Sequence, residues 1–229
     1  MILMLAKGEF DRRIEDDGIE VWVSQQGPFG NVNTAFINRA TNTVVIIDPY
    51  SAKKWLSALE NEGLSPTHII LTHTHRDHTS GVKKIMKSHP EVELWGHVES
   101  NYPNLLGRVL FRHIDFTHTW NHPVHSGEQW TAGGITLEVT HTPGHAPGHQ
   151  SILLNLPKTG HVLLTIDAAY TMDHWNNKCL PGLLHSSSDS AKSVNKLRKI
   201  AKENKAIIVT GHDPGAWSTF KKAPTFYYE

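Results

Sequence analysis

The chain has 229 residues, and its 22 Lys and Arg residues balance its 22 Asp and Glu residues. This length allows one large domain or two small ones, and the zero net charge, without a basic stripe, argues against nucleic-acid binding. No stretch approaches the roughly 20 apolar residues of a membrane span, and the apolar opening MILMLA is too short for a signal peptide. With Cys179 as its one cysteine, we expect a soluble cytoplasmic protein without an internal disulfide.

Strand-like and helix-like segments alternate along the first hundred residues. Runs rich in β-branched and aromatic side chains predict strands over 19–25, 33–39, 43–48, 67–73 and 92–98. Apolar residues at helical spacing predict a helix that Ser51 caps and Gly63 ends, and a second helix is expected over 81–88.

The second half begins with an irregular stretch, 99–127, and then returns to regular patterns. Strands are predicted over 134–141, 149–156 and 161–168, and the PKTG turn at 157–160 makes the last two a hairpin. A helix ending near Asn204, capped by Ser188 or Asp189, precedes a buried strand in 206–213. No linker or repeat interrupts the chain, so we expect one α/β domain over 1–229.

The histidines, 17 in all, are the anomaly of the composition, and they crowd into the segment THTHRDHTSG, 72–81. In an extended segment alternate side chains point the same way, so His73 and His75 can face one point. Asp77 and His78 lie just beyond them. An isolated His-x-His pair is more often an exposed loop than a ligand pair, but imidazole with carboxylate is also a ligand set for zinc, iron, cobalt or manganese.

Other strand ends supply further candidate ligands. His145 lies in a Gly/Pro turn, Asp167 follows an apolar strand, and His212 follows another. Taken singly, Asp167 could cap a helix and His212 could be an ordinary turn residue. An unpaired carboxylate at the end of an apolar strand is costly unless it meets a cation, and the order of all these residues together favours a metal site.

This order resembles the metallo-β-lactamase superfamily along essentially the whole chain. The resemblance implies an αββα sandwich with a dinuclear site along one edge of its sheets. It implies that His73, His75 and His145 bind a first divalent metal and that Asp77, His78 and His212 bind a second, with Asp167 bridging both. Zinc is the expected metal, with iron, cobalt or manganese as alternatives.

Two stretches narrow the substrate. HTPGHAPGHQSILL and LLTIDAAYT look like those of N-acyl homoserine lactone lactonases, in which a tyrosine three residues after the bridging aspartate faces the substrate. Tyr170 occupies that position, although a packing role is the alternative. True β-lactamases lack a bridging carboxylate. In one major class of them a metal-binding cysteine follows the third histidine, whereas Cys179 lies beyond Asp167 and outside that motif, so we expect it to pack as a small hydrophobe.

The resemblance also implies a mechanism for a quorum-quenching hydrolase of small lactones. A hydroxide bridging the two metals attacks the carbonyl carbon, the phenol of Tyr170 stabilises the oxyanion, and Asp77 protonates the leaving group. His141 and His149 are expected to support the ligands from outside. The sequence does not determine the oligomeric state, and a homodimer is one alternative.

Alternatives remain at this stage. Asp48-Pro49-Tyr50 is more like glyoxalase II, a thioester hydrolase, although the chain ends 17 residues after His212, too few for a helical glutathione-binding region. A β-lactamase and a ligand-binding protein on an inactive scaffold are further alternatives. The segment Leu105–Trp120 matches no lactonase pattern, and its aromatic residues are expected either to wall the substrate or to pack: Phe111, Phe116 and Trp120.

Overall fold

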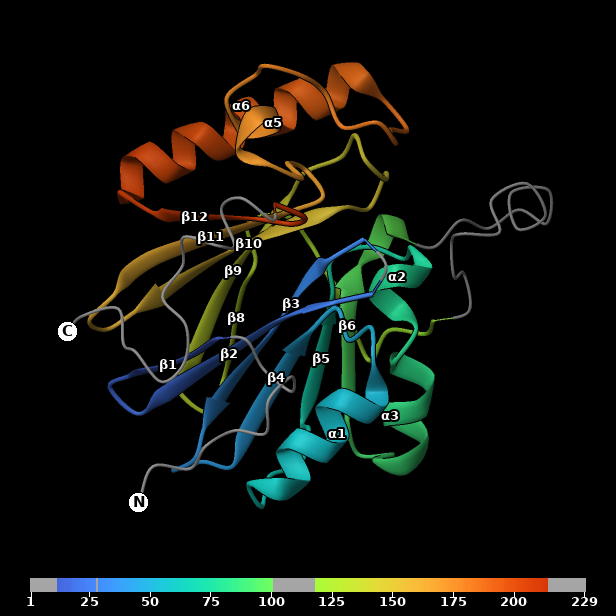
Figure 1. Ribbon diagram of the computed structural model, residues 1–229, viewed down its shortest axis with the longest axis vertical. Coiled ribbons are helices and arrows are strands. Elements are labelled where there is room, and N and C mark those ends of the chain that lie inside the picture. The colour runs from blue at the N-terminus through green and yellow to red at the C-terminus, as the bar shows by residue number, and fades with distance from the viewer. Residues whose placement is uncertain (1–11, 28, 101–117, 214–229) are drawn as a thin grey trace.

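The computed structural model describes residues 12–27, 29–100 and 118–213 and folds them into two facing β-sheets with helices outside (Figure 1). The first sheet has the strand order β1-β2-β3-β4-β5-β6-β7 and the second β12-β11-β10-β9-β8. This is the predicted αββα arrangement, and that prediction is confirmed.

The first sheet is antiparallel from β1 to β4 and parallel from β4 to β7. Its strands are β1 (Arg12–Asp16), β2 (Ile19–Gln26), β3 (Asn31–Asn38), β4 (Thr43–Ile47), β5 (His68–Leu71), β6 (Glu93–His97) and β7 (His122–Val124). Because β4, β5 and β6 run parallel, their carboxyl ends meet at one edge of the sheet.

The second sheet is antiparallel from β8 to β11, and β12 pairs with β11 in parallel. Its strands are β8 (Gln129–Ala132), β9 (Ile135–His141), β10 (Gln150–Leu156), β11 (Gly160–Ile166) and β12 (Ile207–Thr210). The predicted hairpin is β10–β11, and the main-chain N–H groups of its turn donate to the buried carboxylate of Asp16.

Helices cover the outer faces of both sheets (Figure 1). They are α1 (Ala52–Asn61), α2 (Arg76–Thr79), α3 (Val82–Ser88), the 3₁₀ turn η1 (Val98–Ser100), α5 (Met172–Trp175) and α6 (Ser187–Asn204). Trp55 of α1 and Ile85 of α3 pack on the first sheet, whereas Leu197 of α6 packs on the second. A third apolar cluster, which includes Phe36 and Leu137, fills the space between the sheets.

Several details differ from the sequence-based expectations. Three short strands, β1, β7 and β8, were not predicted. The cap of α6 is Ser186, whose side chain accepts from the main-chain N–H of Asp189, and not Ser188 or Asp189. The strand β12 is not buried, because it lies at the edge of its sheet and Ile207 is exposed.

The structure also shows the environments of Cys179 and Trp120, for which the sequence led to expectations. Cys179 is exposed, so the expectation that it packs as a small hydrophobe is wrong. Trp120 packs against the core of the first sheet and lies over Gly96, whereas Phe111 and Phe116 fall outside the described residues. Within the described ranges, no helix is both long enough and apolar enough to span a membrane.

Candidate metal centre

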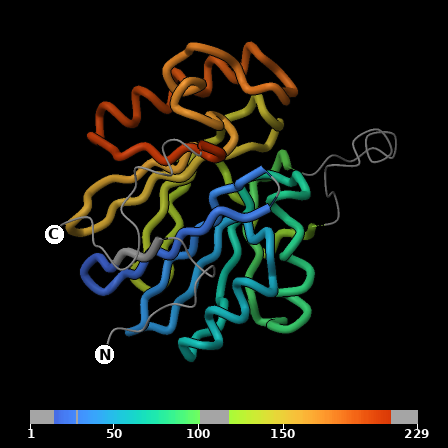
Figure 2. Tube along the Cα trace, in the orientation of Figure 1, coloured from blue at the N-terminus to red at the C-terminus, as the bar shows by residue number. Residues whose placement is uncertain are grey.

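The seven predicted ligands come from segments far apart in the sequence that meet at one edge of the sandwich. His73 follows β5, and His75 is the residue before α2, on which Asp77 and His78 lie. The segment 77–78 is therefore a one-turn helix and not a simple turn. Across the site, the blue β2–β3 hairpin approaches the red end of the trace beyond β12 (Figure 2), where the Val32 N–H donates to the carbonyl of Gly211.

A first group of four donors lies in the interior of the site. Nε2 of His145 lies 2.7 Å from Nδ1 of His75 and 3.2 Å from Nε2 of His73. The same nitrogen lies 3.1 Å from Oδ2 of Asp167. All four side chains are buried, and their ligand atoms lie within 4.8 Å of one another.

A second group shares Asp167 with the first. Nε2 of His212 lies 2.9 Å from Oδ1 of Asp167, and Nε2 of His78 lies 3.6 Å from Oδ2. These three donors also lie within 4.8 Å of one another. Asp77 stands at the edge of this group, with its Oδ2 3.8 Å from Nε2 of His78. The geometry thus places one carboxylate between two sets of imidazoles.

The hydrogen bonds of three histidines test whether cations fit between these donors. Each directs Nδ1 at an acceptor outside the groups, namely His78 to the Asp48 carboxylate, His145 to the Leu183 carbonyl and His212 to the Phe29 carbonyl. With the proton on Nδ1, the Nε2 lone pairs of His145 and His212 each face an oxygen of Asp167. Nε2 of His78 lies close to both Asp167 and the amide nitrogen of Asn31. Facing lone pairs repel each other unless a proton or a metal cation lies between them, and imidazole nitrogens converging on one carboxylate are a donor set that suits divalent metal ions.

The electrostatics of the buried groups agree with cation binding. Burial and three neighbouring imidazoles hold the pKa of His73 well below its usual value, which leaves the ring neutral. Burial alone would raise the pKa of Asp167, but His78, His145 and His212 outweigh it, and the pKa lies well below its usual range. Against burial, the charge of Asp167 in turn raises the pKa of His78 and of His212, so positive charge is favoured on this side of the carboxylate. A metal ion would supply that charge and would bind the neutral form of each imidazole.

Asp48 is a supporting residue whose role the sequence reasoning missed. It follows β4 with a left-handed backbone, φ 49°, and its carboxylate accepts from the N–H and the hydroxyl of Thr72 and from Nδ1 of His78. A carboxylate behind a ligand histidine fixes the orientation of the ring and raises its basicity. The signal was available, because Asp48 ends an apolar strand just as Asp167 does.

Asp167 is held in place by the backbone on either side of it. The pairing of β11 with β12 shifts register between Leu164 and Ile166, and Ile166 has φ 52°, an unusual conformation for a β-branched residue. The N–H of Asp167 donates to Nε2 of His149, whose pKa burial lowers to about 3. His149 is therefore neutral, and it fixes the main chain of the shared carboxylate rather than joining either group.

Glycines precede two of the ligands because the backbone comes too close for a side chain. Gly144, before His145, has φ 136°, and a Cβ there would lie 2.3 Å from the Ser190 nitrogen. A Cβ on Gly211, before His212, would lie 2.7 Å from the Ile166 carbonyl oxygen. Any other residue would push these segments apart, so the Gly-His pairs in the sequence reflect close packing as well as ligand placement.

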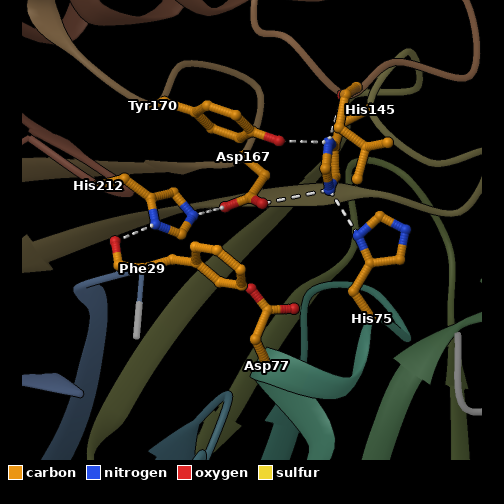
Figure 3. Close-up of a pocket in the computed structure, with 8 residues that line it drawn as sticks. Phe29, His75, Asp77, His145, Asp167, Tyr170 and His212 are labelled. Carbon is orange, nitrogen blue, oxygen red and sulfur yellow. Dashed lines mark hydrogen bonds and ion pairs between the residues drawn. The ribbon is translucent and has the colours of Figure 1, made fainter. Parts of the chain in front are cut away.

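A cavity of about 480 Å³ opens beside both groups (Figure 3). Besides metal-ligand candidates, its described lining includes Tyr170, Phe29 and Leu183. The last two are exposed, at 69% and 50%, and stand at the mouth. The hydroxyl of Tyr170 lies 3.0 Å from Nδ1 of His145, and burial, then the charges of Asp167 and Asp77, raises the pKa of this phenol.

A further trio of donors, His97, Glu99 and His141, lies outside these groups. The two imidazole rings stack, with centroids 4.1 Å apart and planes at 15°, so they do not point at a common centre. Nδ1 of His97 accepts from the N–H of Glu99, and Nε2 of His141 donates to the carbonyl of Pro147. His141 therefore supports the loop that carries His145 through packing and a hydrogen bond.

The chain is similar in sequence to proteins of known family. The model of the metallo-beta-lactamase superfamily matches residues 27–212. N-acyl homoserine lactonase AttM of Azorhizobium caulinodans is 60% identical over 95 residues, which cover 42% of this chain and 36% of that protein. AttM of Rhizobium radiobacter is 39% identical over 177 residues, 75% of this chain and 67% of that protein. The chain thus spans roughly a third to two thirds of these curated relatives.

Solved structures share the fold. The BLEG-1 B3 metallo-beta-lactamase superposes with a TM-score of 0.66 at 24% identity, over 85% of this chain and 92% of that one. A quorum-quenching N-acyl homoserine lactone hydrolase superposes with a TM-score of 0.67 at 20% identity, over 94% of both chains. From the family match and the shared fold, the chain belongs to the metallo-β-lactamase superfamily.

Proposed function

We propose that the protein is a metal-dependent hydrolase that opens the lactone ring of N-acyl homoserine lactones. The observation that carries this proposal is the shared carboxylate of Asp167 between two sets of imidazole lone pairs, with Tyr170 beside them at the cavity. The relatives named N-acyl homoserine lactonase support the substrate class.

The proposal gives each donor a role. His73, His75 and His145 would hold one divalent ion, His78, His212 and Asp77 the other, and Asp167 would contact both, with zinc as the first candidate. When bound, such ions lower the pKa of water toward 7 and polarise the substrate carbonyl. The protein's own contribution is to fix the donors, through acceptors such as Asp48, before substrate arrives.

Tyr170 is suited to stabilise negative charge on the substrate oxygen. Its raised pKa keeps the phenol protonated at neutral pH. If Nε2 of His145 serves as a ligand, Nδ1 carries the proton that it donates to the Leu183 carbonyl, so this nitrogen has no lone pair to accept the Tyr170 phenol proton across their 3.0 Å contact. The phenol proton is then free to point into the cavity, where it can meet a developing oxyanion.

Asp77 is assigned the protonation of the departing alkoxide. Its side chain lines the cavity and is partly exposed, so it can take a proton from solvent and deliver it within the site. Opening the ring breaks the bond between the acyl carbon and the ring oxygen, and the leaving oxygen remains tethered to the product. One proton delivered to that oxygen completes the reaction.

The charge of the cavity favours a neutral lactone over the alternatives. No lysine or arginine is among its described lining residues, and the mouth residues Phe29 and Leu183 are apolar. Glutathione thioesters and cephalosporins both carry carboxylates, which such sites usually pair with cationic side chains. An N-acyl homoserine lactone carries no charge, and its acyl chain matches the apolar mouth.

Initial rates on N-acyl homoserine lactones, S-lactoylglutathione and a cephalosporin, measured side by side on zinc-loaded protein, test the proposal. We expect turnover of the lactones to exceed that of the other two by at least about 100-fold in kcat/KM, about 2.7 kcal/mol of discrimination. A preference for the thioester or the cephalosporin would replace the proposed function. Zinc-loaded protein without turnover of any substrate would favour an inactive scaffold.

Tyr170→Phe is expected to keep the fold and both metals while lowering lactone kcat about 10-fold, with less change in KM. Loss of one oxyanion donor typically costs about 10²-fold or more, but here a metal would share the charge. An effect on kcat rather than KM indicates an interaction made in the transition state. If Tyr170 only packs, the variant will melt at lower temperature and hydrolyse lactones at the normal rate.

A further inference from the structure

The β2–β3 hairpin makes main-chain hydrogen bonds to the donor group that contains His212. The carbonyl of Phe29, in the turn, accepts from Nδ1 of His212, and the N–H of Val32 donates to the carbonyl of Gly211, the residue before His212. These polar contacts of the hairpin fall on the half of the centre assigned to the second metal.

Asn31, the first residue of β3, makes the closest of these contacts. Its side chain is fully buried, and Nδ2 donates to both the main-chain carbonyl of Asp77, at 3.1 Å, and the carboxylate Oδ2, at 3.0 Å. Nδ2 also lies 3.1 Å from Nε2 of His78. One amide thus contacts two adjacent candidate ligands.

We propose that Asn31 is a positioning residue for the second metal ion, because its amide holds the carboxylate of Asp77 on the side of His78. This inference rests on the two-metal part of the proposed function. Asp77 needs such support because it is the most exposed member of its group, at 25% against 12% for His212, whereas His78 and Asp167 are buried. Without it, the carboxylate can rotate toward solvent, and metal binding must then order that side chain.

The amide suits this role for a chemical reason. Both acceptors on Asp77 are oxygens, so only the nitrogen end of Asn31 can face them, which fixes the orientation of the amide. A carboxylate at position 31 would repel Asp77, and an alkyl side chain would leave the buried carbonyl of Asp77 without this donor. The amide oxygen Oδ1 has no hydrogen-bond partner among the described residues, an unusual cost for a buried group.

Zinc titration against a chromophoric chelator tests the role in the full chain, with Asn31→Ala as the variant. We expect the affinity for the second zinc to fall about 10-fold or more, as for other groups that orient metal ligands, with the first site changed by less than 2-fold. Asn31→Ser, whose short hydroxyl does not span both acceptors, should show the same selective loss and serves if Asn31→Ala does not fold.

Asn33→Ala is the matched control. Asn33 lies on the same strand and is equally buried, and its side chain bonds the Asn31 carbonyl and the Tyr50 N–H but no candidate ligand. It should lose stability and keep both zinc affinities. Equal effects of Asn33→Ala and Asn31→Ala, or two normal affinities in Asn31→Ala, would overturn the inference.

The readout also distinguishes this inference from the proposed function. Zinc affinity does not depend on which substrate is hydrolysed. If the wild-type chain binds two zinc ions, a selective loss in Asn31→Ala supports the inference even where lactones are not turned over. If the wild-type chain binds only one zinc, both the inference and the two-metal assignment fail.

Discussion

Asp167→Asn is expected to lower lactone turnover by roughly 10²- to 10³-fold or more and to release metal from both groups. The carboxylate lies 2.9 Å from His212 and 3.1 Å from His145, so it would contact both ions, and a neutral amide cannot balance two dications. Removing one partner of a buried charged pair costs about 3–5 kcal/mol, which corresponds to that change in rate. Elemental analysis and kcat/KM on one preparation measure both effects.

Asp16→Asn provides a matched control for this variant. Asp16 is also a fully buried aspartate, and its carboxylate accepts from the N–H groups of Lys158 and Thr159, neither of which is a candidate ligand. We expect Asp16→Asn to lower the melting temperature and to keep two metals and normal kcat. Should Asp167→Asn behave in the same way, the shared-ligand assignment of Asp167 would be wrong.

The parts of the fold that the sequence predicts well are those whose local pattern matches their final environment. Strand β4 (TVVII) is a nearly continuous apolar run because both of its faces are covered, and all five of its residues are buried. Ser51 caps α1 as predicted, because its side chain accepts from the N–H of Lys54 within the same turn. Such interactions are local, so the chain carries their signal in a few neighbouring letters.

The elements that escaped prediction depend on partners far away in the sequence. β7 has three residues and β8 has four, too few for a period to show. Both are stabilised by pairing, β7 with β6 and β8 with β9. The start of α6 was placed two or three residues late, because several polar residues there can cap a helix and only the structure selects Ser186.

In the candidate site, too, the residues with a local sequence pattern could be predicted and those that act through distant partners could not. His-x-His-x-Asp-His is a local motif, and the strand-end residues His145, Asp167 and His212 carry a recognisable Gly or apolar context. The residues that orient these ligands carry no comparable signal in the sequence. Asn31 meets Asp77 across 46 positions of sequence, and the Leu183 and Phe29 carbonyls act through their main chain, which leaves no side-chain signal at all.

Asp48→Asn carries the second large expected effect, a loss of roughly 10- to 100-fold in the affinity of the metal that His78 would bind. Asn tolerates the left-handed backbone at this position about as well as Asp, so the substitution changes charge and hydrogen bonding and little else. The three groups that face Asp48, the Thr72 N–H, the Thr72 hydroxyl and Nδ1 of His78, all donate to it. An amide offers one acceptor oxygen and places N–H donors against the remainder.

Thr72→Val distinguishes two roles of the Asp48 carboxylate, which are stabilising the loop through Thr72 and orienting His78. It removes the hydroxyl donor to Asp48 and leaves the carboxylate and its charge facing His78, so the second zinc affinity should fall by less than in Asp48→Asn. The lost hydrogen bond to a charged group, about 1.5–3 kcal/mol, should appear mainly as a lower melting temperature. If Asp48 only stabilises the loop, both variants will melt at lower temperature and titrate with wild-type zinc affinities. A selective fall in Asp48→Asn would instead show that His78 needs the negative charge behind it, because that charge both holds the ring and makes Nε2 the better donor.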